Sequence, residues 1–172
     1  TAQRWARMLR EDYAVRLVKE WPDADTTDDG TDILLALHAR RSAASVAAWA
    51  QAHPDKPLVL ALTGTDLYRD IQSDASAQRS LALAHRLIVL QALGPMALPE
   101  GLRARSRVVF QSSTPRRTLV KTAQHLRALA VGHLREEKSP RTLFEAARLI
   151  RPDEGILIDH IGDALDPVLA DE

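Results

Sequence analysis

The sequence contains no cysteine among its 172 residues. Disulfide bonds and thiolate chemistry are therefore excluded, and this composition is typical of a reducing compartment, so we expect a cytoplasmic protein. Net charge is absent too, because 23 Lys and Arg residues balance 23 Asp and Glu residues. We therefore expect no nucleic-acid partner, although a local cluster of basic residues could still bind a small anion.

Long apolar runs are also missing. No stretch of the sequence approaches the roughly 20 apolar residues that cross a bilayer, so we expect no membrane partner. The apolar residues make up 45% of the chain and instead form short runs, and a chain of this length can bury a sizeable core. The runs cover residues 33–37, 58–62, 87–90, 107–110, 126–131 and 156–161.

Continuous apolar runs without polar alternation favour parallel β-strands that are buried on both faces. Two segments between the runs have apolar residues at helical spacing, residues 39–53 and residues 140–150. Ser42 is the expected N-cap of the first helix, and Ser139 is the expected N-cap of the second. This alternation predicts an α/β fold with parallel sheets, in which ligands bind at the carboxyl ends of the strands.

The two ends of the sequence are unusual for such a fold. The chain opens on an amphipathic helix at residues 2–10, whereas a doubly wound domain opens on a strand and a glycine-rich turn. Only two strands and one helix follow Thr122, which is too little for a second core. We therefore expect a segment of a longer protein. The expected boundaries are residues 1–113 for a first domain, 114–125 for a linker and 126–172 for the start of a second domain.

Metal binding is not expected. The acidic tract at residues 23–32 lacks the Glu and the spacing of a calcium loop, so we expect a solvated loop there. The histidines show no spacing typical of a zinc site.

Two turns after predicted strands carry candidate anion-binding residues. Arg40 and Arg41 stand just before a predicted helix, where free N–H groups and the helix dipole favour an anion. The second turn combines hydroxyls, a glycine that allows close approach and a carboxylate that could orient a hydroxyl or take a proton. Its residues are Thr63, Gly64, Thr65 and Asp66. Solvated arginines and a plain turn are the alternative interpretations.

A third turn follows the run at residues 126–131. Gly132 and His133 come first, and the cations Arg135 and Lys138 follow. Two cations near a strand-end glycine could neutralise a diphosphate that departs as a leaving group. An ordinary charged loop is the alternative interpretation.

Two motifs in the last third of the chain resemble a known family. VGHLREEKSP at residues 131–140 resembles the donor-binding turn of GT-B glycosyltransferases of the family 4 type, in which a glycine and an arginine precede a lysine. Lys138 matches that lysine, and His133 stands where the pattern has arginine. IGDA at residues 161–164 resembles the second glycine turn of the same domain.

The wider set of motifs LHARRSAAS, LTGTDLYRDI, VVFQSS and DHIGDALDP resembles the selenosugar synthases of selenoneine biosynthesis. The resemblance covers nearly all of the chain. It implies a transferase that joins selenophosphate to the sugar of a UDP-sugar of the UDP-GlcNAc or UDP-glucose type, without a cofactor. It implies a GT-B fold of two Rossmann-like domains, with the acceptor side in residues 1–113 and the beginning of the nucleotide-sugar donor domain in residues 126–172.

The resemblance also implies roles for the residues of the three turns. The catalytic residues would be Lys138 and Arg135, and the donor-binding residues would be Gly132, His133 and Gly162. The acceptor-binding residues would be Arg40, Arg41, Thr63, Gly64, Thr65 and Asp66. Two alternatives stay open, namely a family 4 transferase with an oxygen acceptor, which needs a base such as Asp66, and a non-catalytic binding fragment. We expect the segment alone to be inactive.

Overall fold

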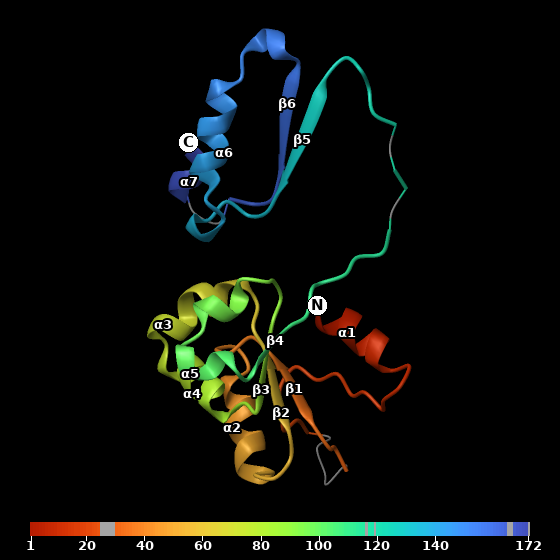
Figure 1. Ribbon diagram of the computed structural model, residues 1–172, viewed down its shortest axis with the longest axis vertical. Helices are drawn as coiled ribbons and strands as arrows, with labels where there is room; N and C mark the ends of the chain where they lie inside the picture. Colours follow the sequence, from red (N-terminus) through yellow and green to blue (C-terminus); the bar gives the residue numbers. More distant parts are fainter. Residues whose placement is uncertain (25–29, 116, 119, 165–166, 172) are drawn as a thin grey trace. The chain divides into compact units, whose positions relative to one another are not determined.

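The computed structural model describes residues 1–24, 30–115, 117–118, 120–164 and 167–171. The chain consists of two compact units, Thr1–Ser113 and Thr114–Glu172, and each unit contains its own parallel sheet (Figure 1). The predicted α/β fold with parallel sheets is therefore confirmed. Of the acidic tract that was predicted to be a loop, residues 25–29 lie outside the described residues.

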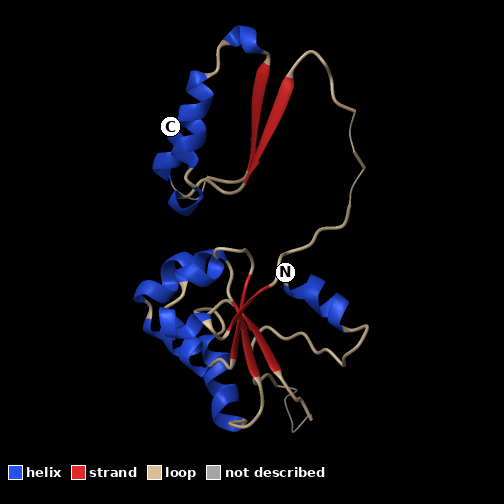
Figure 2. Ribbon diagram, in the orientation of Figure 1, coloured by secondary structure: helices blue, strands red, loops and turns tan. Residues whose placement is uncertain are grey.

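The first unit is built on a sheet of four parallel strands in the order β1-β2-β3-β4. Neighbouring strands that follow one another through right-handed crossovers place their connecting helices on one face, and Figures 1 and 2 show α2 to α5 on one side of the sheet and α1 on the other. The strands are β1 (Leu34–Leu37), β2 (Leu58–Ala61), β3 (Arg86–Val89) and β4 (Ser106–Val108). The helices are α1 (Ala2–Leu9), α2 (Ala43–Ala52), α3 (Ile71–Ser73), α4 (Ala75–Leu83) and α5 (Glu100–Arg103), with a π-helical segment η1 (Asp66–Asp70) and a 3-10 turn η2 (Gly94–Ala97).

The core of the first unit lies between the sheet, α2 and α4. Leu60 of β2 and Leu87 of β3 are fully buried and belong to one cluster with Trp49 of α2 and Leu81 of α4. Trp49 packs edge-on against Trp21, with ring centroids 4.9 Å apart. Full burial of each large apolar side chain stabilises the fold by roughly 1.5–3 kcal/mol. The loops at the carboxyl edge of the sheet are therefore anchored to a well-packed core.

The helical stretch that follows β2 was not predicted from the sequence, and neither were α4 and α5. Residues 64–73 form a continuous helix that begins directly after β2, and its middle part is the π-helical segment η1. The sequence favoured a turn here because Gly64 and the hydroxyls of Thr63 and Thr65 are typical of loops. The helix forms because Leu67 and Ile71, one helical turn apart, both enter the core. π-helical turns inside α-helices are frequent at functional sites.

The second unit contains two parallel strands, β5 (Leu126–Val131) and β6 (Ile156–Ile161), which pair from Leu126 opposite Ile156 to Val131 opposite Ile161. Its other elements are η3 (Glu136–Lys138), α6 (Pro140–Leu149), η4 (Pro152–Glu154) and α7 (Pro167–Asp171). The predicted burial of these strands on both faces is wrong. Leu129 and Val131 are 58% and 72% exposed, because the single connecting helix α6 can cover only one face of a two-stranded sheet.

Among the described residues, no helix combines the length and the apolar character that a membrane crossing requires. The cytoplasmic location expected from the composition stays a prediction.

Candidate functional site

The first two predicted turns meet at one edge of the four-stranded sheet. β1 and β2 pair in parallel, with Leu37 opposite Ala61, so their carboxyl ends lie side by side. The turn at residues 38–42 leads from β1 into α2, and Thr63 leads from β2 into the helix at residues 64–73. This edge is where α/β folds bind ligands.

Asp66 holds the two turns together. Its side chain is fully buried, and its Oδ2 atom accepts a hydrogen bond of 2.8 Å from the N–H of Ala39. Its Oδ1 atom accepts two further bonds of 2.8 Å, one from the N–H and one from the hydroxyl of Thr63. Buried polar groups are stable only with hydrogen-bond partners, and these three donors give both carboxylate oxygens a partner. Asp66 therefore shapes the site from within and does not face solvent.

His38 occupies a strained position beside this carboxylate. Its φ angle is 75°, a left-handed conformation that is rare for residues other than glycine, although histidine adopts it more often than most. Its ring lies between two buried carboxylates, with Nδ1 3.9 Å from Oδ2 of Asp66 and Nε2 3.9 Å from Oδ2 of Asp70. The hydrogen bond from the adjacent Ala39 to Asp66 holds the strained turn in place.

The charge state of His38 follows from its surroundings. Burial lowers the pKa of His38 below its ordinary value of 6.5, and this effect outweighs the opposing influence of Asp66. Arg41 and Arg40 lower the pKa further, while Asp70 raises it. The imidazole is therefore neutral at pH 7.

We predict that His38 makes the folded state less stable in mild acid. Below pH 6.5 the unfolded chain binds a proton that the folded chain binds only at lower pH, so the free energy of unfolding falls as the pH decreases through this window. Urea unfolding at pH 7.5 and pH 5.5 measures the effect. His38→Asn retains a residue that tolerates positive φ and should show a smaller loss than the wild type, whereas an equal loss in both proteins would contradict the prediction.

The two neighbouring arginines have different surroundings. The Nε atom of Arg40 lies 3.0 Å from Oδ2 of Asp70, and Nε of Arg69 lies 3.0 Å from Oδ1 of the same buried carboxylate. The contact with Arg40 is an ion pair without hydrogen-bond alignment, since this oxygen has no hydrogen-bond donor within the described residues. Arg41 is exposed and has no acidic partner in the described part of the chain. Within the described residues, its guanidinium group is therefore a cation of this edge without an acidic partner.

The backbone N–H groups around Arg41 are already used, because those of Ser42 and Ala43 donate to the carbonyls of His38 and Arg40, and that of Arg41 donates to Nδ1 of His38. Ser42 precedes α2, but its hydroxyl donates to the carbonyl of Leu37 at 2.6 Å and makes no cap hydrogen bond to the helix, so the predicted side-chain cap is absent. At Gly64 an added Cβ would meet nothing within 4 Å, so no internal contact demands glycine there. Thr65 makes no side-chain hydrogen bond within the described residues. Within the described residues, the open N–H groups of this edge are those of Gly64 and Thr65, because the first N–H groups of a helix have no helical acceptor, and the space above Gly64 is open.

Three residues of this edge escaped the sequence-based prediction, namely His38, Asp70 and Gln91. Gln91 comes two residues after β3, and its side-chain N–H donates to the hydroxyl of Tyr68. His38 directly follows β1, so its position at a strand end was a usable signal. Asp70 lies four residues after Asp66, on the same face of a helix that was not predicted.

The third predicted turn lies in the second unit. Gly132, His133 and Lys138 line a pocket of about 150 Å³ together with His160, whereas Arg135 and Gly162 are not part of its lining. The N–H of Asp163 donates to Nδ1 of His133 at 3.0 Å, so the neutral ring carries its proton on Nε2.

Gly162 has an internal reason to be glycine. A Cβ added there would lie 2.0 Å from the carbonyl oxygen of Gly132 and 2.5 Å from its carbon. A Cβ at Gly132 itself would only touch the side chain of Lys138 at 3.9 Å. The packing of the chain itself therefore explains glycine at position 162, and the donor-binding role expected of Gly162 stays a prediction.

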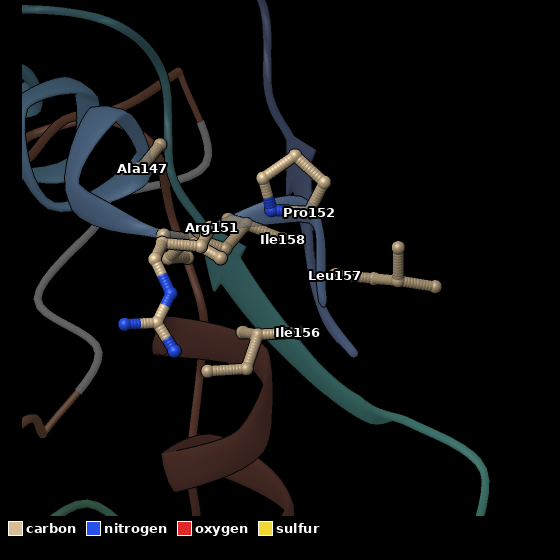
Figure 3. Close-up of a pocket in the computed structure, with 7 residues that line it drawn as sticks. Ala147, Arg151, Pro152, Ile156, Leu157 and Ile158 are labelled. Carbon is tan, nitrogen blue, oxygen red and sulfur yellow. The ribbon is translucent and has the colours of Figure 1, made fainter. Parts of the chain in front are cut away.

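A larger hollow of about 380 Å³ lies at the other end of β6 (Figure 3) and holds none of the predicted site residues. Its lining is mostly apolar and consists of Ala147, Ile150, Arg151, Pro152, Ile156, Leu157 and Ile158. Its one charged group, Arg151, pairs with Asp153 at 3.2 Å and Glu154 at 3.6 Å. Size alone therefore does not make this hollow the better candidate site.

Comparison with known proteins gives one finding. Residues 109–159 match the family model described as CbbQ/NirQ/NorQ C-terminal. The match covers less than a third of the chain, starts just before the boundary between the two units and leaves most of the first unit unmatched. No curated protein matches the chain.

This match overturns the activity predicted from the resemblance. The matched family is of the AAA+ chaperone type and is not a glycosyltransferase family. The predicted selenosugar synthase activity, the oxygen-acceptor alternative and the classification of the chain as a glycosyltransferase are therefore wrong. A resemblance at the level of the fold does not fix an activity, because the same α/β folds carry many unrelated functions. The residue positions and partners named with that activity stay predictions.

Proposed function

We propose that the first unit is a binding domain for a small tetrahedral oxyanion of the phosphate type, a class that includes the selenophosphate implied by the family resemblance. The free guanidinium group of Arg41 carries the proposal. Arg41 belongs to the turn between β1 and α2, and the helix that begins at Gly64 follows the neighbouring strand β2 at the same edge of the sheet. Anions bind where helix N–H groups and an arginine converge.

The proposed role of this edge is to bind a ligand, without catalysing a reaction of it. His38 is neutral and buried, and the carboxylate of Asp66 is filled by three donors. Within the described residues, neither group at this edge is placed to take a proton from a ligand. A non-catalytic binding role, one of the alternatives that the sequence left open, is the role that fits these contacts.

Arg41→Ala should weaken binding of inorganic phosphate at least about tenfold, because a hydrogen bond to a charged group contributes roughly 1.5–3 kcal/mol. Titration of the ¹⁵N-labelled full chain measures the affinity, and the amide signals of Gly64 and Thr65 should shift. Arg86→Ala is the matched control. Arg86 is exposed at the first residue of β3, at the opposite edge of the sheet.

Two results would contradict this proposal. The first is an unchanged affinity in the Arg41→Ala protein. The second is an equal loss in the Arg86→Ala protein, which would show that overall charge and not the turn binds phosphate.

The finer architecture expected from the resemblance, two Rossmann-like domains of the GT-B type, is proposed as a fold alone. The four-stranded parallel sheet of the first unit and the parallel pair β5 and β6 of the second support it. This proposed fold does not by itself imply a transferase activity.

A second candidate function concerns the second unit, and the family match at residues 109–159 favours it. We propose that this segment has the role of the C-terminal region of CbbQ/NirQ/NorQ proteins. An experimental structure of such a region should then show the same order of parallel strand, helix and parallel strand as β5, α6 and β6. A different order would remove this candidate.

A further inference from the structure

The carboxyl edge of the first sheet also carries an apolar surface that the anion site does not explain. Four large side chains there are more than half exposed, namely Tyr68 at 53%, Leu93 at 70%, Met96 at 64% and Phe110 at 68%. Single exposed apolar residues are ordinary, but a contiguous apolar patch usually marks a binding surface. These four residues are called the apolar patch below.

The patch is organised around Gln91, just past the end of β3. The hydroxyl of Tyr68 accepts a hydrogen bond from the side-chain nitrogen of Gln91, and the side-chain oxygen of Gln91 accepts a bond of 2.8 Å from the N–H of Leu93. Gln91 thereby holds the ring of Tyr68 and the start of η2 against each other.

The remaining two members are brought to the same place by the sheet and by η2. Val89 of β3 pairs with Val108 of β4, so Phe110, two residues beyond Val108, stands level with Gln91. Met96 belongs to η2, which contacts both η1 and β4. The patch therefore covers the carboxyl ends of β3 and β4.

The edge of the sheet is thus divided into two halves. Over β1 and β2 it offers Arg41 and the open N–H groups at Gly64 and Thr65, and over β3 and β4 it offers the apolar patch. Neighbouring strands lie about 4.8 Å apart, so the start of the patch is one strand away from the proposed anion site. Tyr68 belongs to the helix that begins at Gly64, which makes the two halves continuous.

We propose, resting on the anion site described above, that the ligand of the first unit is an amphiphilic phosphoryl compound. Its phosphoryl group lies over the ends of β1 and β2, and an aromatic or other flat apolar group lies on the apolar patch. A phosphoryl group at Gly64 and Thr65, just after β2, lies one strand spacing from the end of β3, so an attached ring reaches the near part of the patch at Tyr68 and Leu93. Inorganic phosphate alone would leave the patch uncovered.

The test compares inorganic phosphate, phenyl phosphate and 1-naphthyl phosphate in titrations of the full chain. The affinity should rise in this order and should be at least tenfold higher for 1-naphthyl phosphate than for inorganic phosphate, because the larger ring covers more of the patch. Leu93→Ser and Met96→Ser should bring the ratio of these two affinities toward one. Both side chains are exposed, and tryptophan fluorescence verifies that the variants fold. Leu149→Ser, at an exposed leucine of α6 in the second unit, is the matched control and should leave the ratio unchanged.

The other outcomes separate this inference from the proposed function. Equal affinity for all three phosphates would overturn the amphiphilic ligand and leave the anion site intact. Absence of binding for all three would overturn both. Equal binding of 1-naphthol, which lacks the phosphoryl group, would overturn the inference by showing that the patch acts without the anion site. Sedimentation that shows a dimer disrupted by Leu93→Ser would assign the patch to a second copy of the chain instead.

Discussion

Replacing Asp66 with alanine is expected to destabilise the first unit by at least about 3 kcal/mol. The change removes the acceptor of the buried N–H of Ala39 and of both donors of Thr63. Each buried donor without a partner costs about 1–3 kcal/mol. The strained turn at His38 also loses the hydrogen bond from Ala39 to Asp66 that holds it in place. Phosphate affinity should fall as well, because both turns of the proposed site depend on this carboxylate.

Urea unfolding followed by tryptophan fluorescence measures this effect, since Trp5, Trp21 and Trp49 all lie in the first unit. Asp55→Ala is the matched control, because it removes an exposed carboxylate from the loop before β2 and should change the free energy of unfolding by no more than about 0.5 kcal/mol. A loss below about 1 kcal/mol in the Asp66→Ala protein would show that the turns hold without the carboxylate.

Replacing Gly162 with alanine is expected to disrupt the carboxyl end of the β5–β6 pair. The new Cβ would overlap the carbonyl group of Gly132, 2.0 Å from its oxygen. Backbone cannot yield as a flexible side chain can, so the two turns must separate. The bond of 2.7 Å between Nε2 of His160 and the same carbonyl would then be lost, along with the bond from Asp163 to His133. Overlap in a packed site costs about 1–3 kcal/mol and more where backbone must move.

Amide hydrogen exchange of peptides from residues 126–164 measures this change, since the second unit contains no tryptophan. Exchange should become about 10²-fold faster, which corresponds to a decrease of roughly 2.7 kcal/mol in the free energy of local opening. Gly132→Ala is the control, because Gly132 has the same φ angle of 156° but has space for the Cβ. This substitution should accelerate exchange less than Gly162→Ala does. Equal effects at the two glycines would mean that backbone conformation, and not the overlap, requires glycine at Gly162.

The sequence alone determined the α/β class and the approximate strand positions. Continuous apolar runs between turn residues are a local property, so β5 and β6 begin and end at the predicted residues. The helix at residues 64–73 was missed because the loop-like residues at its start concealed the contribution of Leu67 and Ile71 to the core. Local patterns also located the turns after β1 and β2, since candidate residues at strand ends need only the order of elements.

The role of each residue in those turns was decided by the tertiary structure alone. The partner of Asp66 at Ala39 lies 27 positions away in the sequence, and the carbonyl that requires glycine at Gly162 belongs to Gly132 in the preceding strand turn. Arg40 and Arg41 are neighbours with the same side chain. The position of the buried Asp70 decides that Arg40 forms an ion pair with it and Arg41 does not. Pairing, burial and close approach depend on distances between remote segments, and those distances exist only once the strands have packed side by side.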